Sequence, residues 1–73
     1  MEDAQTPPTY TGRASGMRAG FRKAAKDAER LARADLEGRG QWPPPEPIKY
    51  RARMYVRMGN PIHEYVVELT PER

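Results

Sequence analysis

The sequence of 73 residues contains no cysteine, which excludes disulfide bonds and thiolate metal sites. Other reactive groups are scarce: Ser15 is the one serine and His63 the one histidine. Covalent catalysis needs a nucleophile, a base and an orienting group that converge, and these two residues have no evident third member. We therefore expect no enzyme activity, no catalytic residues, no metal site and no cofactor.

Long apolar runs are also missing, and no stretch approaches the roughly 20 residues of a membrane-spanning helix. The first residues, Met1 to Ala4, lack the basic and apolar regions of a signal peptide. Together with the lack of cysteine, this predicts a cytoplasmic protein without a membrane partner. With 37% hydrophobic residues and 8 prolines, the chain should form one small domain with a thin core. The net charge of +3 allows an acidic partner without requiring one.

The strongest pattern lies between Ile48 and Leu69 and predicts a β-hairpin. From Ile48 to Met58, even positions are apolar and odd positions are basic, with Tyr55 as the exception. This is the period of a strand with one buried and one solvated face. The segment from His63 to Leu69 repeats the alternation and is rich in β-branched and aromatic residues.

The turn between these arms fixes the expected register. Pro61 disfavours a two-residue turn at Gly59-Asn60, because it has no N–H and biases the preceding residue towards extended conformations. A loop from Gly59 to Ile62 instead makes both faces of the hairpin self-consistent. The pairs predicted by this loop are Arg57 with Glu64, Arg53 with Glu68, Val56 with Tyr65, Tyr55 with Val66, Met54 with Val67 and Ala52 with Leu69.

Before the hairpin, the pattern from about residue 15 to residue 37 predicts an amphipathic helix. Its apolar stripe consists of Met17, Phe21, Ala24, Ala28 and Leu31. Ser15 is the expected N-cap, and Gly38 is the expected C′ residue.

The remaining segments are predicted to be less regular. Residues 1–14 should form a flexible tail, with a short edge strand at Thr9-Tyr10-Thr11 as the alternative. Residues 38–47 form a proline-rich linker, in which Trp42 should fold back onto the edge of the core. Trp42 is also a candidate docking segment for a partner.

The predicted fold is α+β: one amphipathic helix packed on an antiparallel β-hairpin, or βαββ if the short first strand forms. Residues 15–73 would then make a single small domain. The expected core contains Tyr50, Met54, Val56, Tyr65, Val67 and Leu69 from the sheet, and Phe21, Ala24, Ala28 and Leu31 from the helix.

The order of a helix followed by a long hairpin, with Trp42 close to the start of the hairpin, resembles the βαββ arrangement of the dodecins. These are small oligomeric flavin-binding proteins. The resemblance covers the order of elements and no specific motif, and a run of prolines follows Trp42, so we do not assign the chain to this family and expect no cofactor.

The function favoured by the sequence is a small non-enzymatic interaction or oligomerisation module that docks to a protein partner. A thin core and a marginal hairpin favour a homo-oligomer. The alternative is an RNA- or DNA-binding module, because basic residues surround an aromatic ring that should be partly exposed on one hairpin face. The candidate binding face consists of Lys49, Arg51, Arg53, Tyr55 and Arg57. Glu64 and Glu68 are expected to pair with arginines of this face.

Overall fold

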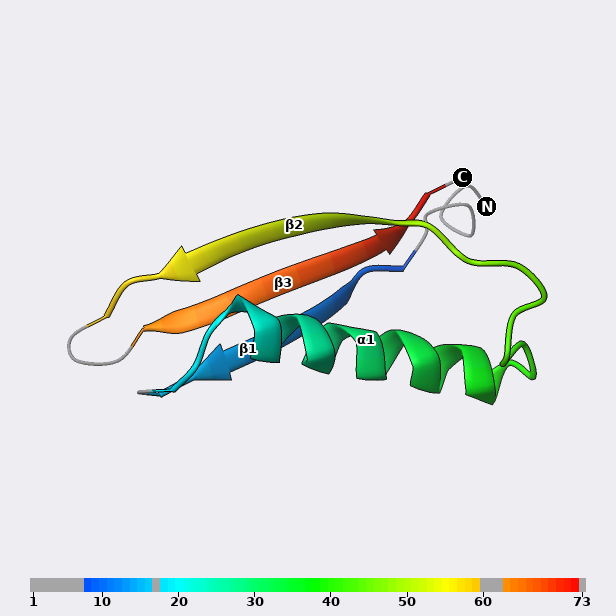
Figure 1. The fold of residues 1–73 in the computed structure, drawn as a ribbon, viewed down its shortest axis with the longest axis horizontal. Helices are drawn as coiled ribbons and strands as arrows, with labels where there is room; N and C mark the ends of the chain where they lie inside the picture. The colour runs from blue at the N-terminus through cyan, green and yellow to red at the C-terminus, as the bar shows by residue number, and fades with distance from the viewer. Residues whose placement is uncertain (1–7, 17, 60–62, 73) are drawn as a thin grey trace.

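The computed structural model describes residues 8–16, 18–59 and 63–72. Its elements are β1 (Tyr10–Ser15), α1 (Phe21–Gly38), β2 (Tyr50–Arg57) and β3 (Glu64–Pro71). They form one helix on one face of a three-stranded antiparallel sheet of order β1-β3-β2, so the last strand lies in the middle (Figure 1). The α+β prediction is confirmed, in its βαββ form. Within the described residues, no helix combines the length and apolar character that a membrane crossing requires.

The register of the β2–β3 hairpin agrees with the prediction at the six pairs from Ala52–Leu69 to Arg57–Glu64. Arg57 lies opposite Glu64 and Arg53 opposite Glu68, while Val56 faces Tyr65. Met54–Val67, Tyr55–Val66 and Ala52–Leu69 complete the predicted set. Most of the predicted loop, residues 60–62, lies outside the described residues. The agreement on either side is what the predicted loop and the alternation of basic and apolar residues together require.

The prediction that residues 1–14 form a flexible tail is wrong for residues 10–14, which belong to strand β1. Residues 10–15 pair with β3, from Tyr10 opposite Leu69 to Ser15 opposite Glu64. The strand is longer than the alternative at Thr9–Thr11, and it contains Gly12 and Ala14, which have little preference for strands. Residues 1–7 lie outside the part of the chain that the structure describes.

The helix begins later than predicted. Ser15 ends β1 and is not the N-cap; Gly20 takes that place with extended backbone and no side-chain cap. At the other end, Gly38 is still helical, and Gly40 is the C′ residue, with φ of 70°. The Gly40 N–H donates to the Glu37 carbonyl at 3.1 Å and the Gln41 N–H to the Leu36 carbonyl at 2.8 Å, which is the Schellman arrangement. Met17, part of the predicted stripe, lies outside the described residues.

The core is built on small side chains that bring α1 close to β1. Ala24 and Ala28 are fully buried, Ala32 is 5% exposed, and all three face the sheet. Gly12 lies directly beneath Ala24 and Ala28: a Cβ atom at this position would overlap their backbone. Val67 of β3 forms a buried cluster with Ala24 and Ala28, and Tyr65 and Leu69 pack partly buried against it. The absence of a side chain at Gly12 therefore allows the helix to approach the sheet.

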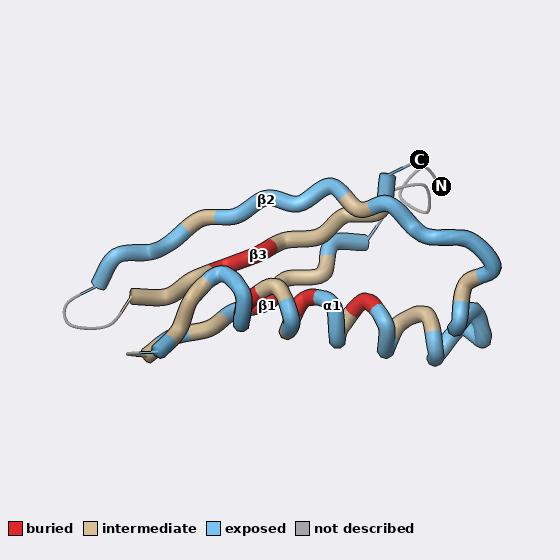
Figure 2. Tube along the Cα trace, viewed as in Figure 1, coloured by how far each residue is buried: buried red, intermediate tan, exposed pale blue. Residues whose placement is uncertain are grey.

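The predicted core wrongly includes apolar side chains of β2, which were expected to lie under the helix. Met54 is 59% exposed and Val56 36% exposed, and Phe21 at the start of α1 is 37% exposed. The reason is the position of the helix, which packs on β1 and β3 and leaves β2 uncovered. Figure 2 shows β2 as mostly exposed, whereas the middle of β3 and one side of α1 are buried.

A first prediction concerns Gly12. Gly12→Ala should lower the free energy of unfolding by about 1–3 kcal/mol, because the added methyl group pushes α1 away from β1. Gly38→Ala is the matched control, since nothing lies within 4 Å of a Cβ atom there and the residue is helical. Urea unfolding measures both variants. Equal stabilities for the two would show that the close approach does not hold the helix in place.

A second prediction concerns the hydrogen bond that joins β1 to the last turns of α1. The Tyr10 hydroxyl donates to Asp35 Oδ2 at 2.5 Å. Burial and this hydrogen bond raise the pKa of Tyr10 from 10.0 to about 12, and the same bond, with help from Arg39, lowers the pKa of Asp35. A raised tyrosine pKa stabilises the fold fully below pH 10, and that contribution disappears between pH 10 and about 12.

Tyr10→Phe should therefore be less stable than the wild type at neutral pH, and the difference should shrink as the pH rises through this window. On the acid side, the contribution of Asp35 is lost as the pH falls through its lowered pKa. Urea unfolding at a series of pH values tests this, together with an absorbance titration of the tyrosines. A stability difference that stays constant up to pH 12 would rule out the bond as the cause.

Candidate functional site

An apolar strip is exposed on the side of the sheet that carries the helix, along the part of β2 that α1 leaves uncovered. It consists of Phe21, Val56, Met54, Ile48 and Trp42. At one end, the Phe21 ring packs edge-on against Tyr65, the cross-strand neighbour of Val56, with ring centres 5.1 Å apart. At the other end, Trp42 and Ile48 come from the connection between α1 and β2. The strip is therefore contributed by three separate segments that the fold brings into one row.

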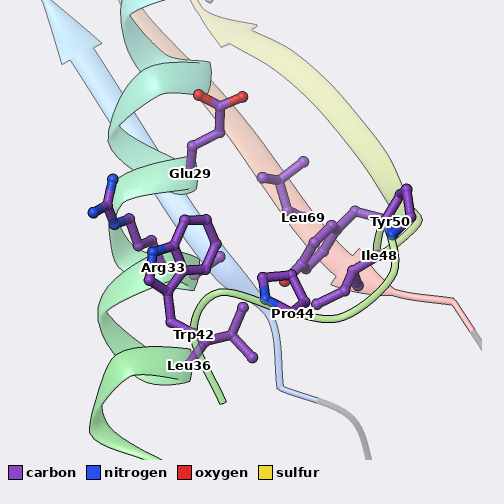
Figure 3. A pocket seen from close by; sticks show the side chains of 10 residues that line it. Glu29, Arg33, Leu36, Trp42, Pro44, Ile48, Tyr50 and Leu69 are labelled. Atoms are coloured by element: carbon purple, nitrogen blue, oxygen red, sulfur yellow. The ribbon is translucent and has the colours of Figure 1, made fainter. Parts of the chain in front are cut away.

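A hollow lies at the Trp42 end of the strip. Its volume is about 610 Å³, and it lies between the second half of α1, the proline-rich connection and the ends of the hairpin (Figure 3). The lining side chains are Glu29, Ala32, Arg33, Leu36, Trp42, Pro44, Pro47, Ile48, Tyr50 and Leu69. Most of this surface is apolar, and Glu29 and Arg33 supply charge at the helix side. Such a surface suits an apolar side chain better than a charged ligand.

Trp42 folds back onto the domain, as the sequence predicts, and remains accessible. The guanidinium of Arg33 lies over its ring, 4.7 Å from the ring centre, and holds the indole against α1. The peptide bond between Trp42 and Pro43 is cis. Trp42 is nevertheless 40% exposed, so it can present an aromatic surface to a partner at the mouth of the hollow.

The opposite face of the sheet carries the basic residues that the sequence singles out. Arg51, Arg53, Tyr55 and Arg57 share one side of β2, and Lys49 precedes the strand. Arg53 Nη1 lies 3.9 Å from Glu68 Oε1, and Arg57 Nη1 lies 3.7 Å from Glu64 Oε1. The predicted ion pairs are thus present. Exposed pairs of this kind each contribute only about 0–1 kcal/mol, so they orient the arginines more than they stabilise the fold.

Arg13 of β1 is a member of this face that sequence reasoning missed. Its Nη1 atom lies 3.7 Å from Glu64 Oε2, so Glu64 stands between two arginines from the two outer strands. Arg13 was missed because β1 was missed: its side chain can be assigned to one face of the sheet only when residues 10–15 are placed in a strand. No local signal marks it otherwise.

Tyr55 has a structural role that the sequence did not indicate. Its ring is half-buried, and the guanidinium of Arg53 lies 5.5 Å from the ring centre. Directly opposite is Val66, which points away from the helix and is nevertheless fully buried. Its cross-strand neighbours, Tyr55 and Arg13, are the side chains placed to cover it. The interpretation of Tyr55 as a free stacking platform is therefore weakened.

His63 accepts a hydrogen bond at Nδ1 from the Gly59 N–H, at 3.3 Å, across the turn between β2 and β3. No group of three or more metal-ligating side chains occurs among residues 8–16, 18–59 and 63–72. The arrangement offers two contact surfaces, one apolar and one basic.

Comparison with protein-family models, with curated proteins and with solved structures finds no match to this chain. The two surfaces are therefore the features from which a function can be inferred. They lie on opposite sides of the same strand, β2, because its side chains alternate in direction.

A third prediction tests the cover over Val66. Tyr55→Ala should lower the free energy of unfolding by about 1 kcal/mol, because it exposes a valine that is now fully buried. Tyr55→Phe keeps the ring and should leave the stability close to that of the wild type. Thermal and urea unfolding provide the comparison. An unchanged stability of Tyr55→Ala would mean that other side chains cover Val66.

Proposed function

We propose that the chain is a small non-enzymatic interaction module that docks onto a protein partner through the apolar strip. The observation that carries this proposal is the exposure of Met54: it is 59% exposed in the middle of a regular strand, on the face where its neighbour Val67 is buried. Exposed large apolar side chains that gather in one row favour an interaction surface over an ordinary solvated one.

The composition of the strip supports a protein partner. Phe21, Met54 and Trp42 belong to the residue types that are enriched at protein interfaces. Aromatic anchors beside a hollow are typical of the residues that dominate binding energy. Glu29 and Arg33 stand beside the hollow and can supply the polar rim that surrounds such anchors.

A second copy of the chain is the first partner to test. The fully buried large side chains in the described residues are Val66 and Val67, so the monomer has a small core. Two copies packed strip against strip would each cover the other's Met54 and Val56, in the self-complementary manner of a two-fold dimer. This supports a homo-oligomer as one form of the proposed docking. The lack of cysteine supports a reducing, cytoplasmic setting for it.

The alternative function is nucleic-acid binding by Lys49, Arg51, Arg53, Tyr55 and Arg57. The acidic side chains of Glu64 and Glu68 lie within 4 Å of two of these arginines, and Arg53 lies over one side of the Tyr55 ring. Both features reduce the attraction of this face for phosphates and bases. We therefore favour the apolar strip, and salt dependence separates the two classes, since phosphate contacts weaken steeply as salt rises.

A fourth prediction tests the proposed function with Met54→Asp. Because Met54 is largely exposed, the substitution should change the free energy of unfolding by about 0.5 kcal/mol or less, while it abolishes association. Ala34→Asp is the matched control: it adds the same charge at an exposed position on the outer side of α1. Sedimentation of the purified protein measures self-association, and capture from nuclease-treated lysate measures docking to other proteins.

The control variant should behave as the wild type in both measurements. Association that Met54→Asp leaves intact would exclude the strip as the docking surface. Retention of nuclease-sensitive material alone, lost at high salt, would replace the proposal with the nucleic-acid alternative.

A further inference from the structure

The outer edge of β2 is an open strand edge. In the sheet order β1-β3-β2, β2 has β3 on one side, and no described residue pairs with it on the other. The strand runs from Tyr50 to Arg57 without proline or glycine, and every residue in it except Tyr50 and Tyr55 is exposed. Such an edge presents a row of unpaired N–H and C=O groups to any extended chain.

Charge makes this edge unsuitable for a second copy of itself. Two antiparallel copies of β2 that keep their faces aligned place residues 51, 53, 55 and 57 opposite one another. With Met54 opposite Met54, Arg51 faces Arg57; with Arg53 opposite Arg53, Lys49 faces Arg57; with Tyr55 opposite Tyr55, Arg53 faces Arg57. Like charges directly opposite each other destabilise a strand pair. The arginines thus act against edge-to-edge self-pairing, a role that charged residues often have on exposed edges.

The inner edge of β2 shows what kind of strand this sequence accepts. On β3, Glu64 and Glu68 lie opposite Arg57 and Arg53 on one face. On the other face, the apolar residues Tyr65, Val67 and Leu69 lie opposite Val56, Met54 and Ala52. The partner of β2 inside the domain is therefore a strand in which acidic and apolar residues occupy opposite faces.

The arginines of β2 remain available to a second such strand. The Arg53 side chain is 78% exposed and that of Arg57 is 67% exposed, despite their contacts with β3. Arg51 lies opposite Thr70, an uncharged residue, and is also exposed. The other outer strand, β1, is shorter and has one arginine, Arg13, which already contacts Glu64. The combination of an open edge and accessible cations is found on β2.

We propose that the outer edge of β2 binds an extended segment of a partner protein in which acidic residues alternate with apolar ones, as an added antiparallel strand. The acidic residues lie over Arg51, Arg53 and Arg57, and the apolar residues lie beside Met54 and Val56. Main-chain hydrogen bonds supply affinity and the two rows of side chains supply selectivity. This inference rests on the proposed function and names the chemistry of its partner. The same arginines that reject a second β2 select the acidic strand.

The test uses a synthetic peptide derived from the chain itself. It copies residues 63–70 with Val66→Glu and Thr70→Glu, so that every side chain on one face is acidic. The control peptide has lysine in place of each glutamate. Fluorescence anisotropy with the full-length protein should show at least tenfold tighter binding of the acidic peptide at low salt. Hydrogen exchange should show protection of β2 backbone amides that are unprotected in the free protein.

A charge reversal in the protein provides the second part of the test. Arg51→Glu should weaken binding of the acidic peptide and strengthen binding of the lysine peptide, because the preferred charge is exchanged. Equal binding of the two peptides would overturn the inference, as would protection confined to β1.

The inference and the proposed function can fail separately. If the acidic peptide does not bind while association of the protein still depends on Met54, the edge inference falls and the apolar strip stands as the docking surface. If the acidic peptide does not bind and association of the protein does not depend on Met54, both the edge inference and the proposed function are wrong.

Discussion

The close approach of α1 to β1 is the constraint from which the rest of the arrangement follows. Gly12 has no side chain, and the helix presents Ala24 and Ala28 above it, so the two backbones nearly touch. A helix held this close to β1 covers β1 and β3 and cannot also cover β2. Larger side chains such as Phe21 are left at the margin, where they remain partly exposed. The contact that stabilises the domain is thus also the reason that one apolar row faces solvent.

The central strand, β3, contributes side chains to the buried cluster on one face of the sheet and to ion pairs on the other. On one face, Val67 joins the alanines of the helix in the buried cluster. On the other, Glu64 contacts Arg13 and Arg57, which come from the strands on either side, and Glu68 contacts Arg53. Each of these pairs is weak alone. Together they make one register satisfactory on both faces, because a slip by one residue would place arginines against apolar side chains.

The parts of the fold that sequence reasoning recovered are those that depend on periodicity: the helix on its three- and four-residue spacing and the hairpin on alternation. The β2–β3 register follows from the positions of the arginines and glutamates, and the basic face follows with it. Strand β1 was missed because Gly12 and Ala14 have little preference for strands; their small size matters only once a helix lies above them. The helix start was misplaced because Met17 continues the spacing of Phe21 and Ala24. The apolar strip was assigned to the core, since the sequence does not indicate which strands a single helix covers.

The position of β3 also determines the order in which the strands can pair. It is the last of the described strands and the middle one, and it is the partner of both others (Figure 1). During synthesis, β1, α1 and β2 leave the ribosome before either strand has a neighbour with which to form ladder hydrogen bonds. Pairing of Tyr10 with Leu69 then closes most of the chain in one step. Such a non-local contact incurs its loop-closure entropy before it adds stability, so β1 should join the β2–β3 hairpin late.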